Sequence, residues 1–166
     1  VNVHERCDTP VEFLVTEQWY IRLLDKKEEY LEAGRSMDWF PDKMFTRYKN
    51  WIEGLQWDWA ISRQRSSGIP FPVWYCADCD HPVMAESENL PVDPLSDDPS
   101  TDTCAECGHD AFVPEQDVLD TWATSSLTPL INAGWQGERE GMTRPELYPM
   151  NMRPQGHDII SFWLFH

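Results

Sequence analysis

The clearest periodic pattern of apolar residues lies between residues 41 and 57, in the segment PDKMFTRYKNWIEGLQW. Its apolar positions recur at the spacing that places side chains on one face of an α-helix. Asp42 stands just ahead of the pattern and is a candidate N-cap, whereas Gly54 weakens the last turn. We therefore predict a helix whose apolar stripe packs in the core, formed by Met44, Tyr48, Trp51, Ile52 and Leu55.

Two weaker patterns precede this helix. Residues 11–23 are rich in β-branched and aromatic side chains, which predicts an extended segment. Residues 23–34 place Leu24, Glu28 and Leu31 at helical spacing. Gly34 is the expected stop of that helix, because glycine is favoured just after a helix ends.

The pattern changes at Pro70 and Pro72, which a helix interior does not accommodate, so a new unit begins here. Residues 84–103 are rich in Pro, Ser and Asp, and predict an exposed loop. Residues 117–135 predict a strand or turn that leads into a short helix. Residues 148–166 predict a strand, a tight turn at Gly156 and a helix. This alternation of strand and helix indicates an α/β layer with a small insert.

The charge of the chain is large and unevenly distributed. The 166 residues carry a formal net charge of −16, and no lysine or arginine occurs from Ser66 to Gln136. Nucleic-acid-binding domains carry a basic surface instead, so the charge on its own argues against a nucleic-acid partner. The alternative hypothesis is a halophilic protein, whose acidic surface keeps it dissolved at high salt whatever it binds.

Two features of the sequence indicate the cellular compartment of the protein. Its apolar runs are shorter than the roughly 20 residues that a membrane-spanning helix needs. The first ten residues, VNVHERCDTP, lack the basic, apolar and cleavage regions of a signal peptide. We therefore expect a cytoplasmic protein without a membrane-spanning segment.

Four of the five cysteines form two pairs with the spacing C-x2-C-x24-C-x2-C. Two such pairs supply the four soft ligands of a closed tetrahedral zinc site, and Gly108 favours the tight turn of the second pair. Two disulfides are the alternative, but five cysteines leave one over and no secretory signal is seen. A thioredoxin-like redox site would need a single C-x-x-C. We therefore predict a structural zinc ion bound by Cys76, Cys79, Cys104 and Cys107.

Three further residues belong to the same question. His81 and His109 adjoin the two cysteine pairs, and we expect them to support the site or lie on the surface rather than bind the metal. Cys7 stands alone and is expected to be a partly buried free thiol. A zinc ribbon stabilises a small unit without defining a reaction, so function must be sought in other segments.

Three segments, DWAISRQRSSGIPFPVWYC, DVLDTWATSSLTPLINAGW and MRPQGHDIISFWLFH, together resemble the catalytic domain of valyl-tRNA synthetases, which are class I aminoacyl-tRNA synthetases. The segment CDTPVEFLVTEQWYI resembles the stretch where the chain of this family returns from its editing domain. The resemblance is collinear and covers nearly all 166 residues. The I-S-R-Q and D-V-x-D-x-W motifs are shared with isoleucyl and leucyl relatives, whereas RPQGHDII is similar to archaeal valyl sequences. With the acidity, this suggests a haloarchaeal source.

The resemblance implies an α/β fold, in which a Rossmann-like part of a class I catalytic domain carries an inserted zinc ribbon. It assigns residues 1–15 to the return segment from the editing domain, 16–71 and 115–166 to the Rossmann-like part, and 72–114 to the insert. For the whole enzyme the resemblance implies that L-valine reacts with ATP, bound with Mg²⁺, to give an adenylate, and is then transferred to tRNA(Val). The zinc takes no part in this chemistry, and we expect a monomer.

The resemblance also implies a valine pocket. Trp122 of the D-V-x-D-x-W motif, which includes Asp117 and Asp120, would wall this pocket together with Ile159. A small, rigid, apolar wall suits valine because a pocket discriminates by the room it leaves. From the residue pattern alone, Trp122 and Ile159 could equally be core residues.

A ribose site is implied by Gly156 and Asp158, which match the family's G-x-D turn against the adenylate ribose. Glycine lets the backbone approach a ligand closely, and a carboxylate accepts hydrogen bonds from both ribose hydroxyls. Asp158 could also cap the helix that follows it.

The I-S-R-Q motif supplies Ser62, Arg63 and Gln64, which by resemblance lie at the seam between editing and catalytic domains. Arg63 precedes the long acidic stretch, so contact with the acceptor end of the tRNA is one role for it. A structural hydrogen-bonding role is the one that we favour.

The ATP-binding motifs of the family, H-I-G-H and K-M-S-K-S, are absent from these residues. The resemblance places the first upstream of the editing domain and the second just beyond His166. We therefore assign no catalytic residue within the chain and expect it not to aminoacylate by itself. Two alternatives stay open: a segment of an isoleucyl-type synthetase, and a zinc-ribbon binding module without catalysis.

Overall fold

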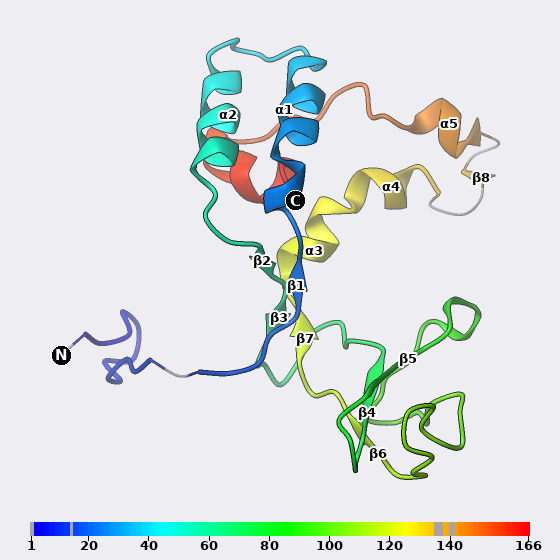
Figure 1. Cartoon of the computed structure of the whole chain (residues 1–166). Helices are drawn as coiled ribbons and strands as arrows, with labels where there is room; N and C mark the ends of the chain where they lie inside the picture. The colour runs from blue at the N-terminus through cyan, green and yellow to red at the C-terminus, as the bar shows by residue number, and fades with distance from the viewer. Residues whose placement is uncertain (1, 14, 135–137, 140–141) are drawn as a thin grey trace.

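The structure is a computed structural model that describes residues 2–13, 15–134, 138–139 and 142–166. In Figure 1 the first two helices lie at one end and a three-stranded sheet lies at the other, with two of the short strand pairs between them. The elements in chain order are β1 (Tyr20–Ile21), η1 (Leu24–Lys26), α1 (Lys27–Arg35), α2 (Met44–Gly54), β2 (Trp59–Ala60), β3 (Ser62–Arg63), β4 (Val73–Cys76), β5 (Pro82–Met84), η2 (Ser87–Asn89), β6 (Phe112–Pro114), β7 (Val118–Leu119), α3 (Thr121–Ser126), α4 (Thr128–Asn132), β8 (Glu138–Arg139), β9 (Met142–Thr143), α5 (Arg144–Leu147), η3 (His157–Ile159) and η4 (Ile160–Leu164).

The main core lies where α1 and α2 run side by side and the C-terminal helix η4 packs against them (Figure 1). The ring of Phe165 contacts the edge of Tyr30 at 5.2 Å between centroids and that of Tyr48 at 6.3 Å. The predicted apolar stripe is confirmed for four of its five residues, since Tyr48 and Ile52 are buried and Met44 and Leu55 pack around them, whereas Trp51 is exposed and lies outside the core. The buried members of this core are Leu23, Leu31, Tyr48, Ile52, Ile160 and Phe165. Each such side chain contributes about 1.5–3 kcal/mol by leaving water.

Both predicted helix ends need correction. Helix α1 runs past Gly34 to Arg35, so Gly34 lies inside the helix rather than after it. Its role is packing, because a Cβ at this position would overlap the ring of Tyr48. Helix α2 has Lys43 rather than Asp42 at its N-cap position, and the carbonyl of Asp42 accepts a 3.1 Å hydrogen bond from the Phe45 amide. Asp42 therefore belongs to the turn that leads into the helix.

The strands pair in antiparallel ladders. Tyr20 of β1 lies opposite Ala60 of β2, and Ser62 of β3 lies opposite Leu119 of β7. The third sheet has the order β5-β4-β6. A Rossmann-like layer is built from parallel strands with helical crossovers, so the ladders of the described residues do not confirm this prediction. They support the coarser statement of a domain with mixed helix and strand.

The C-terminal segment also differs from its prediction. Residues 148–156 form no strand in the described structure, and Pro149 and Pro154 explain this because each removes a ladder donor. Gly156 is extended, with φ −67° and ψ 148°, and serves as the N-cap residue of η3 rather than as a tight turn. The helix predicted after it is present as η3 and η4.

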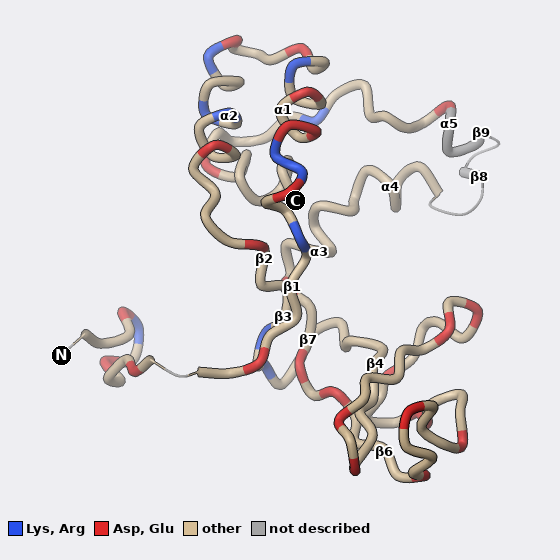
Figure 2. Tube along the Cα trace, viewed as in Figure 1, with Lys and Arg blue, Asp and Glu red and all other residues tan. Residues whose placement is uncertain are grey.

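The sheet β5-β4-β6 carries the acidic end of the molecule. Figure 2 shows acidic residues and no basic ones along this unit, while lysine and arginine concentrate on the helical end. The predicted loop of residues 84–103 is largely exposed. It is nevertheless anchored, because the buried indole of Trp74 donates a 3.1 Å hydrogen bond to the carbonyl of Asp97. Within the described residues, no helix combines the length and the apolar character that a bilayer crossing needs.

Candidate functional site

The four paired cysteines meet at one point beside β4. Their Sγ atoms all lie within 4.8 Å of one another, with Cys76 and Cys107 at 3.4 Å and Cys79 and Cys104 at 3.7 Å. All four are free thiols. Four sulfurs held at 2.3 Å around one tetrahedral zinc ion lie roughly 3.8 Å apart. The donor set therefore has the chemistry and the spacing to hold a metal ion such as zinc.

The two cysteine pairs have the same backbone geometry. The amide of Cys76 donates to the carbonyl of His81 at 3.0 Å, and the amide of Cys104 donates to that of His109 at 2.7 Å. The residue after the second cysteine has a positive φ in both pairs, 57° at Asp80 and 77° at Gly108. Glycine and aspartate are among the residues that tolerate this conformation best. The repeated turn points both pairs of sulfurs inward.

The electrostatics of the cluster favour a cation. Burial acts to raise the pKa of the Cys76 thiol, but the amides of Asp78 and Cys79 and the neighbouring thiols outweigh it, so this pKa falls to about 7. For Cys107, the amide of His109 lowers the pKa, whereas burial and the other three cysteines raise it, to about 12. Four thiolates repel one another at this spacing, and a divalent ion would remove that conflict.

The other residues considered with the cysteines are placed as follows. His81 and His109 contribute their backbone carbonyls to the two turns, and the candidate ligand cluster consists of the four cysteines without them. Cys7 is exposed, so the prediction of a partly buried thiol is wrong. Its Sγ lies 3.2 Å from Thr9 Oγ1 and 3.4 Å from His4 Nδ1, and the hydrogen bonds from Thr9 lower its pKa.

The structure brings the I-S-R-Q and D-V-x-D-x-W motifs together through the β3–β7 ladder. Arg63 Nη2 donates to Asp120 Oδ2 at 2.5 Å in an ion pair whose acidic partner is 9% exposed. Gln64 Nε2 donates to Asp117 Oδ2 at 2.7 Å. Two motifs more than fifty positions apart are thus joined side chain to side chain. Sequence reading recognised both motifs but not this pairing.

The serine of the I-S-R-Q motif faces the N-terminal segment. Ser62 is buried, and its Oγ accepts a 3.0 Å hydrogen bond from the Trp19 amide. The same hydroxyl donates to Gln18 Oε1 at 2.9 Å. The serine therefore ties the segment before β1 to β3.

Helix α3 begins at the same junction. Asp120 is its N-cap residue, and Asp120 Oδ1 accepts a 3.0 Å hydrogen bond from the Trp122 amide. The Trp122 ring is half-buried and stacks on Phe162, with centroids 5.2 Å apart and planes at 22°. Trp122 thus lies at the meeting of α3 and η4, outside the core between α1 and α2.

The G-H-D-I segment lies on η3. A Cβ at Gly156 would overlap the Asp158 carboxylate, so the two predicted ribose-binding residues lie against each other. Asp158 is exposed and lies within η3, whose N-cap residue is Gly156, so the alternative role of Asp158 as a cap is wrong. Ile159 is half-buried and its neighbour Ile160 is the residue that joins the core.

Glu115 is an important residue that sequence reading missed. Its Oε2 accepts hydrogen bonds from Trp19 Nε1 at 2.9 Å and Tyr75 OH at 2.7 Å, and its Oε1 accepts the amides of Gln116 and Asp117. Burial acts to raise its pKa, but these donors lower it. Only its position two residues before the D-V-x-D-x-W motif could have pointed to it. Beside it is a hollow of about 720 Å³ lined by Thr16, Glu17, Gln18, Trp19, Tyr20, Gln64, Tyr75, Glu115 and Asp117.

His166 is a second residue that the pattern did not single out. Its ring stacks on Trp59 at 3.8 Å between centroids and contacts Phe162 and Phe165. Burial among these rings lowers the pKa of His166 to about 4, so the side chain is neutral at physiological pH. Because Phe162 also stacks on Trp122, His166 and Trp122 contact the same phenyl ring.

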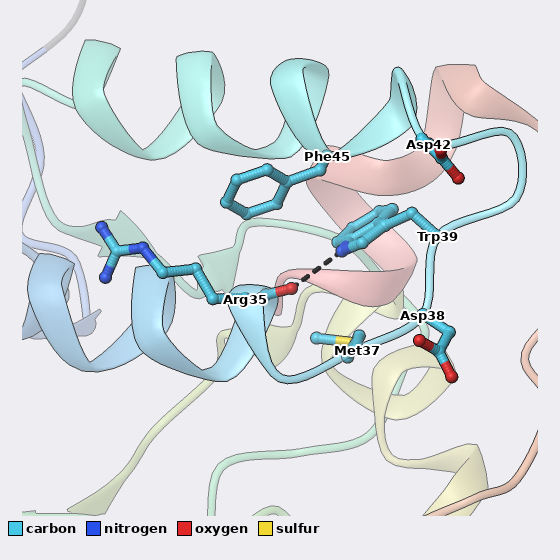
Figure 3. Close-up of a pocket in the computed structure, with 7 residues that line it drawn as sticks. Arg35, Met37, Asp38, Trp39, Asp42 and Phe45 are labelled. Atoms are coloured by element: carbon cyan, nitrogen blue, oxygen red, sulfur yellow. Dashed lines mark hydrogen bonds between the residues drawn. The ribbon is translucent and has the colours of Figure 1, made fainter.

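Another hollow, of about 460 Å³, lies at the turn between α1 and α2, away from the predicted site residues (Figure 3). Trp39 lines it and donates a 2.8 Å hydrogen bond to the carbonyl of Gly34. Asp38 and Asp42 line its rim. The hydrogen bond of Trp39 thus satisfies a backbone carbonyl in the last turn of α1.

Comparison with known proteins gives consistent matches. The family described as tRNA synthetases class I (I, L, M and V) matches residues 3–166. The chain is 71% identical over 170 residues to the valine–tRNA ligase of Haloarcula marismortui, which covers 100% of this chain and 19% of the relative. It is 54% identical over 165 residues to the valine–tRNA ligase of Thermoplasma volcanium, covering 99% of this chain and 20% of the relative. The chain thus spans about a fifth of the length of these curated relatives, and the resemblance indicated by its motifs is confirmed.

Proposed function

The chain belongs to the tRNA synthetases of class I (I, L, M and V), and we propose that it is the catalytic-domain segment of a valine–tRNA ligase. The observation that carries the proposal is the 71% identity to such a ligase along the whole chain. The whole protein would activate L-valine with ATP and Mg²⁺ and transfer it to tRNA(Val). This role implies the cytoplasm, where proteins are synthesised, and the match to Haloarcula marismortui supports a halophilic source.

Within this proposal, Trp122 and Ile159 wall the valine side chain, and Gly156 with Asp158 meets the ribose of the adenylate. Both half-buried pocket residues lie outside the core cluster, which leaves their side chains available for a substrate. The exposed Asp158 carboxylate is in reach of a ligand. Selection of valine then depends on the room that the apolar wall leaves, and catalysis on positioning and charge stabilisation. The segment alone is inactive in this account.

The four cysteines hold a structural zinc ion in the same proposal. Residues 72–114 form the zinc-bearing insert, residues 16–71 and 115–166 the Rossmann-like catalytic part, and residues 1–15 the return from an editing domain. The cluster of four cysteine sulfurs, and the two backbone turns that point them inward, support the assignment of a zinc ion to these cysteines. A bound zinc ion would neutralise part of the thiolate charge and hold the two turns together.

The test is amino-acid-dependent exchange of pyrophosphate into ATP by the full-length protein that contains this chain. A valine–tRNA ligase gives exchange with valine at a much higher kcat/KM than with isoleucine. The opposite preference would identify an isoleucyl-type enzyme. Absence of exchange with every amino acid would favour the zinc-ribbon binding module.

A further inference from the structure

We propose that Arg63 is a positioning residue for amino-acid selection: it holds Asp120 and, through Asp120, the start of the helix that carries Trp122. The inference rests on the proposed function, because it takes Trp122 as a wall of the valine pocket. It gives the I-S-R-Q motif a role in specificity that requires no contact between Arg63 and substrate or tRNA.

Arg63 is itself fixed in direction. Its Nη1 donates to the carbonyls of Ala60 and Ser62, at 2.7 Å each, and these residues belong to β2 and β3. The guanidinium is planar and its donors point in fixed directions, so anchoring Nη1 on two carbonyls aims Nη2. The aimed nitrogen meets Asp120 Oδ2 at 2.5 Å. A lysine could supply the charge but not this set of directions.

Asp120, held by Arg63, in turn orients the start of α3. Its two carboxylate oxygens lie in one rigid plane, with Oδ2 on Arg63 and Oδ1 on the Trp122 amide. The Asp120 amide is also fixed, by a 2.8 Å hydrogen bond to the carbonyl of Ile61. The side chain is 9% exposed, so without Arg63 it would be a buried charge with no cationic partner. The carboxylate would then turn toward water and release the cap.

Helix α3 depends strongly on this cap. It has six residues, Thr121–Ser126, and each of them is only partly buried or exposed, so core burial does little to hold it. Its last residues are held to η4 by hydrogen bonds, from Trp163 Nε1 to the Ser125 carbonyl at 2.8 Å and from Ser126 Oγ to the Phe162 carbonyl at 3.0 Å. Its first turn is held by the cap and by the stacking of Trp122 on Phe162. Loss of the cap would therefore let the Trp122 ring shift. If the volume of the pocket changes by about one methylene group, the discrimination between amino acids changes by about 10- to 200-fold.

The experiment places Arg63→Gln and Arg63→Lys in the full-length protein and measures kcat/KM for valine and isoleucine by pyrophosphate exchange. The valine-to-isoleucine ratio should fall by about tenfold in Arg63→Gln and by less in Arg63→Lys. This ratio does not depend on the fraction of active enzyme, so merely impaired folding leaves it unchanged. Arg47→Gln, on the exposed surface of α2, is the matched control and should keep the wild-type ratio.

A double variant tests the route through Asp120. In Arg63→Gln with Asp120→Asn, the asparagine still caps a helix and leaves no buried charge, so the ratio should return toward that of the wild type. If Arg63→Gln does not fold, the valine-to-isoleucine ratio of kcat/KM measured on Arg63→Lys tests the inference instead. A wild-type ratio in the folded Arg63 variants would overturn the inference while the proposed function stands. A wild-type protein that does not activate valine would overturn both.

Discussion

The indole Nε1 of Trp19 donates a 2.9 Å hydrogen bond to Glu115, which lies 96 positions further along the chain. The hydroxyl of Tyr75, the neighbour of the candidate metal ligand Cys76, donates to the same carboxylate oxygen. One carboxylate therefore links the N-terminal segment, the cysteine-bearing sheet and the strand that leads to α3. The pKa of Tyr75 is raised to about 12, first by burial and then by this hydrogen bond, so the phenol stays a donor at neutral pH.

Replacing Glu115 should change the pH dependence of stability. Its pKa is lowered in the folded state, because the donors outweigh the effect of burial. A lowered carboxyl pKa contributes stability that is complete above the unfolded-state pKa and is lost as the pH falls through the folded-state pKa. The gap in unfolding free energy between wild type and Glu115→Gln should therefore shrink below about pH 4.3. Urea unfolding across this range measures it.

Glu17→Gln is the control for this prediction, because Glu17 lines the same hollow but is exposed. Its unfolding free energy should run parallel to that of the wild type at every pH. If Glu115→Gln also runs parallel to the wild type, the carboxylate does not act as described.

Two glycines of the helical end should respond to alanine in opposite directions. Alanine is favoured over glycine inside a helix by about 1 kcal/mol. At Gly34 the added methyl group would overlap Tyr48, so Gly34→Ala should lower the unfolding free energy by about 1–3 kcal/mol. At Gly54 nothing lies within 4 Å of the added atom, so Gly54→Ala should be neutral or stabilising. Equal stabilisation by both changes would refute the packing role of Gly34.

The cysteine cluster should hold one zinc ion per chain. The four Sγ atoms within 4.8 Å of one another are the motivation. Metal analysis of protein purified without added metal should find close to one equivalent of zinc. Two disulfides and no metal would contradict the assignment.

The metal should stabilise its own unit more than the helical end. Cys104→Ser should speed hydrogen exchange in residues 76–112, whereas α2 should stay protected because its core lies with α1 and η4. Hydrogen exchange read by mass spectrometry resolves the two regions. Uniform loss of protection along the chain would show that the two parts do not unfold independently.

The sequence predicted best those features that depend on local periodicity and on spacing. The stripe from Met44 to Leu55 follows a helical repeat, and apart from the exposed Trp51 it packs in or against the core. The C-x2-C pairs bring their own turn, so the meeting of Cys76 with Cys107 could be predicted from spacing alone. The stripe and the turn of each cysteine pair are set over a few residues, where sequence and geometry are tightly coupled. The meeting of the two pairs, 31 positions apart at Cys76 and Cys107, follows from the four ligands that a closed zinc site needs.

The features that the sequence did not predict are set by contacts between distant segments. Gly34 carries a helix-ending signal, yet the ring of Tyr48 makes it a packing site inside α1. The hydrogen bond of Glu115 to Trp19 and the ion pair of Arg63 with Asp120 join residues far apart in the chain. No periodic pattern marks such pairs. The valine and ribose sites, which depend on a substrate, remain predictions for the same reason.

The acidic end should make the chain more stable in salt. From Ser66 to Glu138 the sequence has fourteen acidic residues and no lysine or arginine. The range of their repulsion falls from about 30 Å at 0.01 M salt to about 3 Å at 1 M. The midpoint of thermal unfolding should therefore rise as KCl increases from about 0.1 M to about 2 M, whereas a protein held by surface ion pairs loses a little stability.

A charge-neutralised variant separates this repulsion from the general effect of salt on apolar groups. Glu86→Gln, Glu88→Gln, Asp98→Asn and Asp102→Asn change exposed residues and leave Asp93 and Asp97, whose carboxylates accept amide hydrogen bonds within the loop. The variant should melt at a higher temperature in low salt and depend less on KCl. The same salt dependence as the parent would show that repulsion is not the cause.

Aminoacylation by the full-length protein is the decisive test of our proposal that the chain selects valine as part of a tRNA ligase. The protein is incubated with ATP, Mg²⁺, a mixture of all amino acids and total tRNA from its source. Mass spectrometry then identifies the amino acid attached to each tRNA. We expect valine, attached to tRNA(Val). Isoleucine on tRNA(Ile), or no attached amino acid at all, would contradict it.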